Sequence, residues 1–218
     1  MIQIQTNSLS VIDMIVNGGA GSIIIILILF ALLMLAVYIY AERTLTFNGL
    51  LKLDSGFVED LNKELRRNSM NVQKAITICK KSDHPSARII RRGLERFKDK
   101  NELGPTKTAI ENEAQFVVYG LERNINILAT ISGAAPMIGF LGTVIGMIIA
   151  FHQMANSGGQ AEMAELASGI YTAMTTTVGG LIVGILSYIG YNHLVTRTQL
   201  IVHDLEKKAS EFLEELDK

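Results

Sequence analysis

The sequence predicts an all-α membrane protein with three transmembrane helices, of which the second and third are very long and extend into a helical cytoplasmic domain. First, a mean hydropathy of +0.30 over 218 residues exceeds that of an ordinary soluble domain, and three long segments without charge account for the excess. Second, apolar residues continue at helical spacing from two of these segments into charged sequence.

The first transmembrane helix is expected at residues 23–41, after a periplasmic N-terminal segment at residues 1–22. Ile23 to Tyr40 is almost purely aliphatic and can cross about 30 Å of hydrocarbon. No Lys or Arg precedes Arg43, so the basic start of a cleaved signal peptide is missing. We therefore expect a helix that is retained.

Residues 42–104 are expected to form a cytoplasmic helical domain of short amphipathic helices, one of them opening at Pro85. Its basic pairs, Lys80-Lys81 and Arg91-Arg92, alternate with acidic residues and have no aromatic reading surface beside them. This composition favours a solvated face or lipid headgroups and argues against a nucleic acid partner. The lone Cys79 is expected to be a small buried residue.

Two long helices are expected after this domain, at residues 105–154 and 164–218, joined by a periplasmic turn at residues 155–163. The first begins near Pro105 and keeps its apolar spacing into the second transmembrane span without interruption. The second leaves the membrane as a C-terminal cytoplasmic helix with a seven-then-four spacing of apolar residues: Leu194, Ile201, Leu205, Phe212 and Leu216.

The distribution of positive charge predicts the orientation. Lys and Arg are absent from residues 1–42 and from the turn at 155–163, and they are abundant in the middle segment and the tail. By the positive-inside rule, the N-terminus and the turn are periplasmic and the C-terminus is cytoplasmic.

Small residues and hydroxyls line one side of each of the last two spans. Such stripes allow transmembrane helices to approach closely, and threonine can bond its own helix or a neighbour. Two stripes on adjacent helices exceed what one intramolecular contact needs, so we expect a homo-oligomer with a lined central cavity. The candidate packing residues are Pro136, Gly139, Gly142, Gly146, Gly169, Gly180 and Gly184, and the candidate pore-lining hydroxyls are Thr143, Thr172, Thr176 and Thr177.

Titratable and catalytic groups are missing from the spans. None of the three contains Asp, Glu, Lys or Arg, so the chain alone lacks an intramembrane proton relay. His152 at the far end of the second span is interpreted as an interfacial histidine. No enzyme motif and no cluster with metal-ligand spacing occurs, so we expect no catalytic site, cofactor or metal.

The last two spans resemble the MotA/TolQ/ExbB proton-channel family, most closely ExbB and TolQ. The resemblance lies in the stretches AAPMIGFLGTVIGM (134–147), ASGIYTA (167–173) and TTVGGL (176–181). It implies an inner-membrane pentamer, with the second and third helices of each subunit surrounding a pore that holds two helices of a single-span ExbD- or TolR-like partner. Proton flow would then energise TonB-dependent protein transport or Tol-Pal work at the outer membrane.

One position departs from that family. ExbB and TolQ carry glutamate where this chain has Thr172, whereas they share threonine at the positions of Thr143 and Thr177. The resemblance then implies that the aspartate of the partner is the sole titrating group. Two alternatives stay open: a non-conducting scaffold whose threonines only bond neighbouring helices, and a self-contained channel or transporter, against which the lack of buried charge counts.

Overall fold

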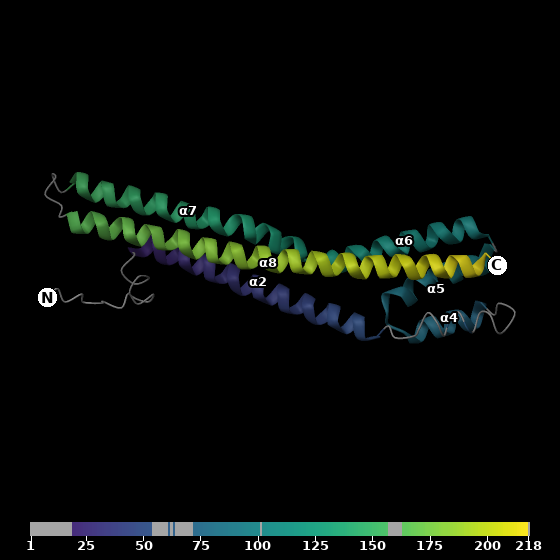
Figure 1. Ribbon diagram of the computed structural model, residues 1–218. Coiled ribbons are helices and arrows are strands. Elements are labelled where there is room, and N and C mark those ends of the chain that lie inside the picture. Colours follow the sequence, from purple (N-terminus) through teal and green to yellow (C-terminus); the bar gives the residue numbers. More distant parts are fainter. Residues whose placement is uncertain are drawn as a thin grey trace. The chain divides into compact units, whose positions relative to one another are not determined.

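A computed structural model describes residues 19–53, 61, 63, 72–100, 102–156 and 163–217. The described residues form helices and short connections, without a strand. Figure 1 shows the helices, which are α2 (Gly19–Leu53), α4 (Val72–Lys81), α5 (Pro85–Lys100), α6 (Leu103–Glu122), α7 (Ile125–Asn156) and α8 (Met163–Leu216). The predicted all-α fold class is confirmed.

The chain divides into two compact units. The first, here called the apolar unit, comprises the residues up to Tyr40 together with Asn126–Tyr191. The second, the charged unit, comprises Ala41–Ile125 and Asn192–Lys218. Helices α2 and α8 therefore contribute to both units.

Three helices are long and apolar enough to cross a membrane, with candidate spans at Ser22–Leu50, Ile125–Asn156 and Leu166–Leu216. Each exposes large apolar side chains; in α2, for example, Leu27 is 61% exposed and Phe30 is 60% exposed. A surface of this kind is stable in contact with hydrocarbon but costly in water. The expected three spans are thus confirmed as helices that could cross a bilayer.

The expected uninterrupted helix at residues 105–154 is corrected, because a break at Arg123 and Asn124 separates α6 from α7. Asn124 adopts a positive φ of 68°, a left-handed conformation that asparagine tolerates better than most residues and that often ends a helix. The break leaves main-chain carbonyls at the end of α6 without helical partners. Arg43 of α2 donates a hydrogen bond to one of them, the Gly120 carbonyl, at 3.3 Å.

The core of the charged unit lies between α5, α6 and α8. Leu94 of α5 is fully buried, and a methyl group placed on Gly93 would come within 2.6 Å of the Ile110 side chain of α6. The predicted apolar spacing in the tail is confirmed, since its five positions in α8 are buried: Leu194, Ile201, Leu205, Phe212 and Leu216. Pro85 opens α5 as expected.

Some expectations fall outside the described residues. The N-terminal segment up to residue 18 and most of the turn at residues 155–163 are among them. So is the amphipathic helix that contains Leu61, of which only Leu61 and Lys63 are described.

Candidate functional site: the contact between α7 and α8

Helices α7 and α8 come together at two facing glycines in the apolar unit. A methyl group built on Gly180 would lie 2.5 Å from the Ala135 carbonyl oxygen and 3.0 Å from Cα of Gly139. A methyl group on Gly139 would lie 2.7 Å from the Thr176 carbonyl oxygen. Because these neighbours are main-chain atoms that cannot move aside, the two helices can pack this closely only through glycine.

The same contact continues toward the end of α7 and the start of α8. A methyl group on Gly146 would meet Cβ of Ala173 at 2.6 Å, and one on Gly169 would meet Cβ of Ala150 at 2.8 Å. Small residues therefore face each other here as well.

Near the other end of the contact, Gly184 of α8 faces Pro136 of α7. A methyl group on Gly184 would lie 2.6 Å from Cγ of Pro136 and 3.0 Å from the Ser132 carbonyl oxygen. The two predicted stripes thus pack against each other within one chain. This arrangement corrects the argument that the stripes exceed one intramolecular contact, and the homo-oligomer with a lined cavity stays a prediction.

Helix α2 packs on the same pair of helices through side chains rather than glycines. A methyl group on Gly142 would crowd the Thr176 side chain and lie 3.1 Å from Cδ1 of Ile25. Farther along, Gly179 has ordinary room, because Cδ1 of Leu29 would lie 3.5 Å from its added methyl group. Gly142 therefore stands where all three helices of the apolar unit meet.

Two threonine hydroxyls of α8 meet at one carbonyl of α7. Thr176 donates a hydrogen bond to the Gly139 carbonyl oxygen at 3.0 Å, and Thr177 donates to the same oxygen at 3.1 Å. The Thr176 hydroxyl also lies 2.7 Å from the Ala173 carbonyl oxygen, and its side chain is fully buried. The missing side chain at Gly139 lets these hydroxyls reach the α7 main chain.

The other two candidate hydroxyls bond within their own helices. Thr143 donates to the Phe140 carbonyl at 2.7 Å, and Thr172 donates to the Ser168 carbonyl at 2.9 Å. Both residues are buried, at 9% and 7% exposure. The structure thus joins Thr176 and Thr177 across the helix contact, and it does not show Thr143 or Thr172 bonded to them.

The four hydroxyls share a chemical consequence. A hydroxyl has one hydrogen to donate and two lone pairs that accept. Because each donor is directed at a main-chain carbonyl, the oxygen can still accept a hydrogen bond. Any further partner of these side chains must therefore be a donor, such as water or a protonated carboxylic acid.

Sequence reasoning missed Ser187 of α8. Its side chain is 1% exposed, and its hydroxyl has no hydrogen-bond partner among the described residues. A single serine in an apolar run carries little signal by itself, whereas the cluster of threonines drew attention. From residue 166 to 191 the sequence has no Asp, Glu, Lys, Arg or His, so Ser187 lies in a stretch without a charged residue.

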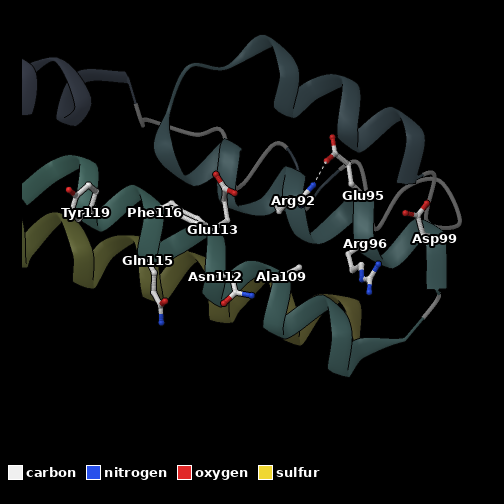
Figure 2. Close-up of a pocket in the computed structure, with 10 residues that line it drawn as sticks. All are labelled: Arg92, Glu95, Arg96, Asp99, Ala109, Asn112, Glu113, Gln115, Phe116 and Tyr119. Carbon is white, nitrogen blue, oxygen red and sulfur yellow. Dashed lines mark ion pairs between the residues drawn. The ribbon is translucent and has the colours of Figure 1, made fainter. Parts of the chain in front are cut away.

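The charged unit contains an open groove of about 870 Å³ between α5 and α6. Figure 2 shows its lining, with the guanidinium of Arg92 directed at Glu95, 3.8 Å away. Phe116 and Tyr119 of α6 are 67% and 74% exposed. Because acidic and basic side chains alternate along its wall, the groove does not select an anion or a cation.

Comparison with known proteins identifies a family whose sequence pattern covers the α7–α8 contact. The sequence pattern of the MotA/TolQ/ExbB proton channel family matches residues 81–207, which is more than half of the chain. The chain belongs to the MotA/TolQ/ExbB proton channel family. The matched region includes all of α7 and the part of α8 that carries the candidate threonines.

Individual members of the family cover much of the chain. The Tol-Pal system protein TolQ of Haemophilus influenzae is 31% identical over 206 residues, which are 87% of this chain and 85% of that protein. The biopolymer transport protein ExbB of Neisseria gonorrhoeae is 27% identical over 161 residues, 67% of this chain and 72% of its own length. The biopolymer transport protein ExbB of Aquifex aeolicus is 34% identical over 117 residues, 52% of this chain and 74% of its own.

Membership in the MotA/TolQ/ExbB family confirms two expectations. These proteins are channel and stator components rather than enzymes, so the prediction of a non-enzyme holds. Together with the three apolar helices, the family supports a protein of the bacterial inner membrane.

Proposed function

We propose that this chain is the channel subunit of an ExbB- or TolQ-like motor, which uses the proton motive force to drive transport or other work at the outer membrane. The observation that carries the proposal is the family match across α7 and α8, the two helices that hold the threonines. The subunits assemble as a homo-pentamer, as the resemblance implies. Because the glycine stripes are occupied within one chain, the contacts between subunits use other faces of these helices.

The proposed partner is a single-span ExbD- or TolR-like protein whose transmembrane helix carries an aspartate. Residues 125–156 of α7 and 166–196 of α8 contain no carboxylate. The family resemblance implies a glutamate at the position of Thr172. A proton that crosses the bilayer needs a group to hold it, because a bare charge in hydrocarbon is costly. Threonine oxygens whose hydrogens are already donated suit a protonated carboxylic acid as their next partner.

The proposed motor has two candidate tasks, TonB-type transport and the work of a Tol-Pal envelope machine. The TolQ relative covers 87% of the chain, and the two ExbB relatives cover 67% and 52% of it. A TolQ-like role in a Tol-Pal envelope machine is therefore the second candidate, beside TonB-type transport that would also involve a TonB-like protein. The scaffold alternative draws support from Thr176, whose buried hydroxyl lies within hydrogen-bond distance of the Gly139 and Ala173 carbonyl oxygens.

A proton-flux experiment separates channel from scaffold. We expect liposomes that contain the purified chain alone to show flux close to that of empty liposomes, because residues 125–151 and 166–192 contain no Asp, Glu, Lys, Arg or His. Addition of the single-span partner should raise the flux, and replacement of its membrane Asp by Asn should remove the increase. Flux that the partner does not change would contradict a motor subunit.

The proposed orientation places the N-terminus and the α7–α8 turn in the periplasm and the C-terminus in the cytoplasm, following the distribution of Lys and Arg. A cysteine in place of Asn156, at the end of α7, should react with an impermeant maleimide outside intact cells, and one in place of Ser210 should not. Cys79 adds little background, because burial raises the pKa of its thiol to about 12. Outside labelling at position 210 but not at 156 would reverse the orientation.

A further inference from the structure

His84 occupies the N-cap position of α5 in the charged unit. The residue before a proline is held out of the helical region, and proline fits the first position of a helix, so His84 and Pro85 set the start of α5. The main-chain N–H of Ser86 donates a hydrogen bond to Nδ1 of His84 at 3.1 Å. An N-cap side chain normally accepts this bond through the oxygen of Ser, Thr, Asp or Asn, and here an imidazole nitrogen replaces it.

This bond defines the protonation state of the ring. An N–H group can donate only to a nitrogen that has a free lone pair, so Nδ1 carries no hydrogen. The Ser86 hydroxyl lies 2.6 Å from the same nitrogen and can donate to it as well. The cap therefore requires neutral imidazole, with its hydrogen on Nε2.

The ring lies in the core of the charged unit, where it connects three helices. His84 is 5% exposed and Ser86 is 1% exposed. The main chain of Leu50, near the end of α2, forms a further hydrogen bond with the ring, and Asp204 of α8 acts on it electrostatically. The cap of α5 is thus coupled to α2 and α8.

Protonation of Nδ1 would break the hydrogen bond that caps α5. A second N–H would face the Ser86 N–H, and the lost acceptor would leave a buried donor without a partner. A positive charge would also stand at the N-terminus of α5, where the helix dipole is positive. Each effect weakens the start of α5.

The charged groups around the ring oppose this only in part. Asp204 of α8 favours the protonated ring, but it is bonded to Lys208, which offsets its charge. Asp83 and Arg88, which are close to His84 in sequence, are exposed and carry opposite charges. Helix α2 contacts the ring through the main chain of Leu50. Burial outweighs these groups, and the pKa of His84 stays below its usual value.

We propose that His84 is a pH-sensitive cap, which holds the start of α5 between α2 and α8 when the imidazole is neutral and releases it when the ring is protonated. The site does not depend on the channel proposal. If the proposed orientation holds, the cap lies in the compartment that receives the protons, and acidification of that compartment would loosen the charged unit.

The direction of the pH effect follows from linkage. Burial lowers the pKa of His84 below its usual value of 6.5, an effect that outweighs the opposing influence of Asp204 and of the Leu50 hydrogen bond. The folded state therefore binds this proton less readily than the unfolded state. The contribution of the cap to stability is complete above pH 6.5 and is lost as the pH falls below that value toward the lowered pKa.

Amide hydrogen exchange of the full chain in lipid nanodiscs tests the cap. Protection factors, corrected for intrinsic exchange, are compared at about pH 7.5 and about pH 5.5 for the first turns of α5 and for α6. We expect protection of the α5 start to fall by about threefold or more at the lower pH, with a smaller change in α6. Equal protection of the α5 start at both pH values would overturn the proposal.

His84→Asn is the matched variant, because asparagine caps a helix well and does not titrate. It should keep the protection of α5 at the higher pH and lose the pH dependence. His203→Asn removes an exposed histidine of α8 and should behave like the wild type. If asparagine does not support α5, His84→Ser takes its place. A non-titrating cap that still shows the wild-type fall in protection would overturn the proposal even if the wild type responds as expected.

Discussion

Gly180→Ala is expected to destabilise the apolar unit by about 2 kcal/mol or more, the cost of overpacking a tight contact. The added methyl group would lie 2.5 Å from the Ala135 carbonyl oxygen, a main-chain atom that can move only if α7 moves. Alanine is otherwise the better helix former by about 1 kcal/mol, so the clash must exceed that gain before any loss is seen.

Gly179→Ala is the matched control in the neighbouring position. Its methyl group would lie 3.5 Å from Cδ1 of Leu29, an ordinary packing distance, so the variant should be as stable as the wild type or slightly more stable. Unfolding in mixed micelles with increasing SDS, followed by circular dichroism, measures both. The proposed contact between Gly139 and Gly180 would be refuted if the two variants had equal stability.

The three spans were predictable because charge-free length is a strong signal for a membrane helix. The break between α6 and α7 was not, since the apolar spacing continues past Asn124 and no proline or glycine marks the site. Whether an asparagine adopts the left-handed conformation depends on what supports it. Here Arg43, distant in sequence, bonds the Gly120 carbonyl beside the break.

The stripes of small residues were visible in the sequence, but the surface that each one contacts was not. Spacing alone puts Gly139 and Gly180 on particular sides of their helices and says nothing of whether those sides meet each other or another subunit. In the structure, Gly139 and Gly180 contact each other within one chain. His84 gave no signal because an imidazole is an unusual N-cap, and only the folded structure places its Nδ1 at the Ser86 N–H.

Thr143→Val and Thr177→Val are expected to lower partner-dependent proton flux by about tenfold each. Valine keeps the shape of threonine but removes the oxygen that would accept a hydrogen bond from the partner's acid or from water. A buried donor left without its acceptor costs about 1–3 kcal/mol, a range that includes the tenfold effect expected here. Thr172→Val should be milder if that position only packs, and comparable if it has taken over part of the role of the family glutamate.

Two further variants separate packing from conduction. Thr176→Val removes a fully buried hydroxyl that lies within hydrogen-bond distance of the Gly139 and Ala173 carbonyl oxygens. It should therefore lower the stability of the apolar unit more than it lowers proton flux. Thr130→Val changes an exposed hydroxyl of α7 that bonds the Asn126 carbonyl of its own helix, and it should change neither property. Stability and partner binding must be equal before fluxes are compared.

The most direct test of the proposed channel is proton flux in liposomes that hold equal amounts of the partner complex, formed with the wild type, Thr143→Val, Thr177→Val or Thr130→Val. A hydroxyl-lined path used by the partner's acid predicts wild-type flux for Thr130→Val and about tenfold lower flux for the other two variants. Full flux in both Thr143→Val and Thr177→Val would contradict that path and leave these threonines as packing residues.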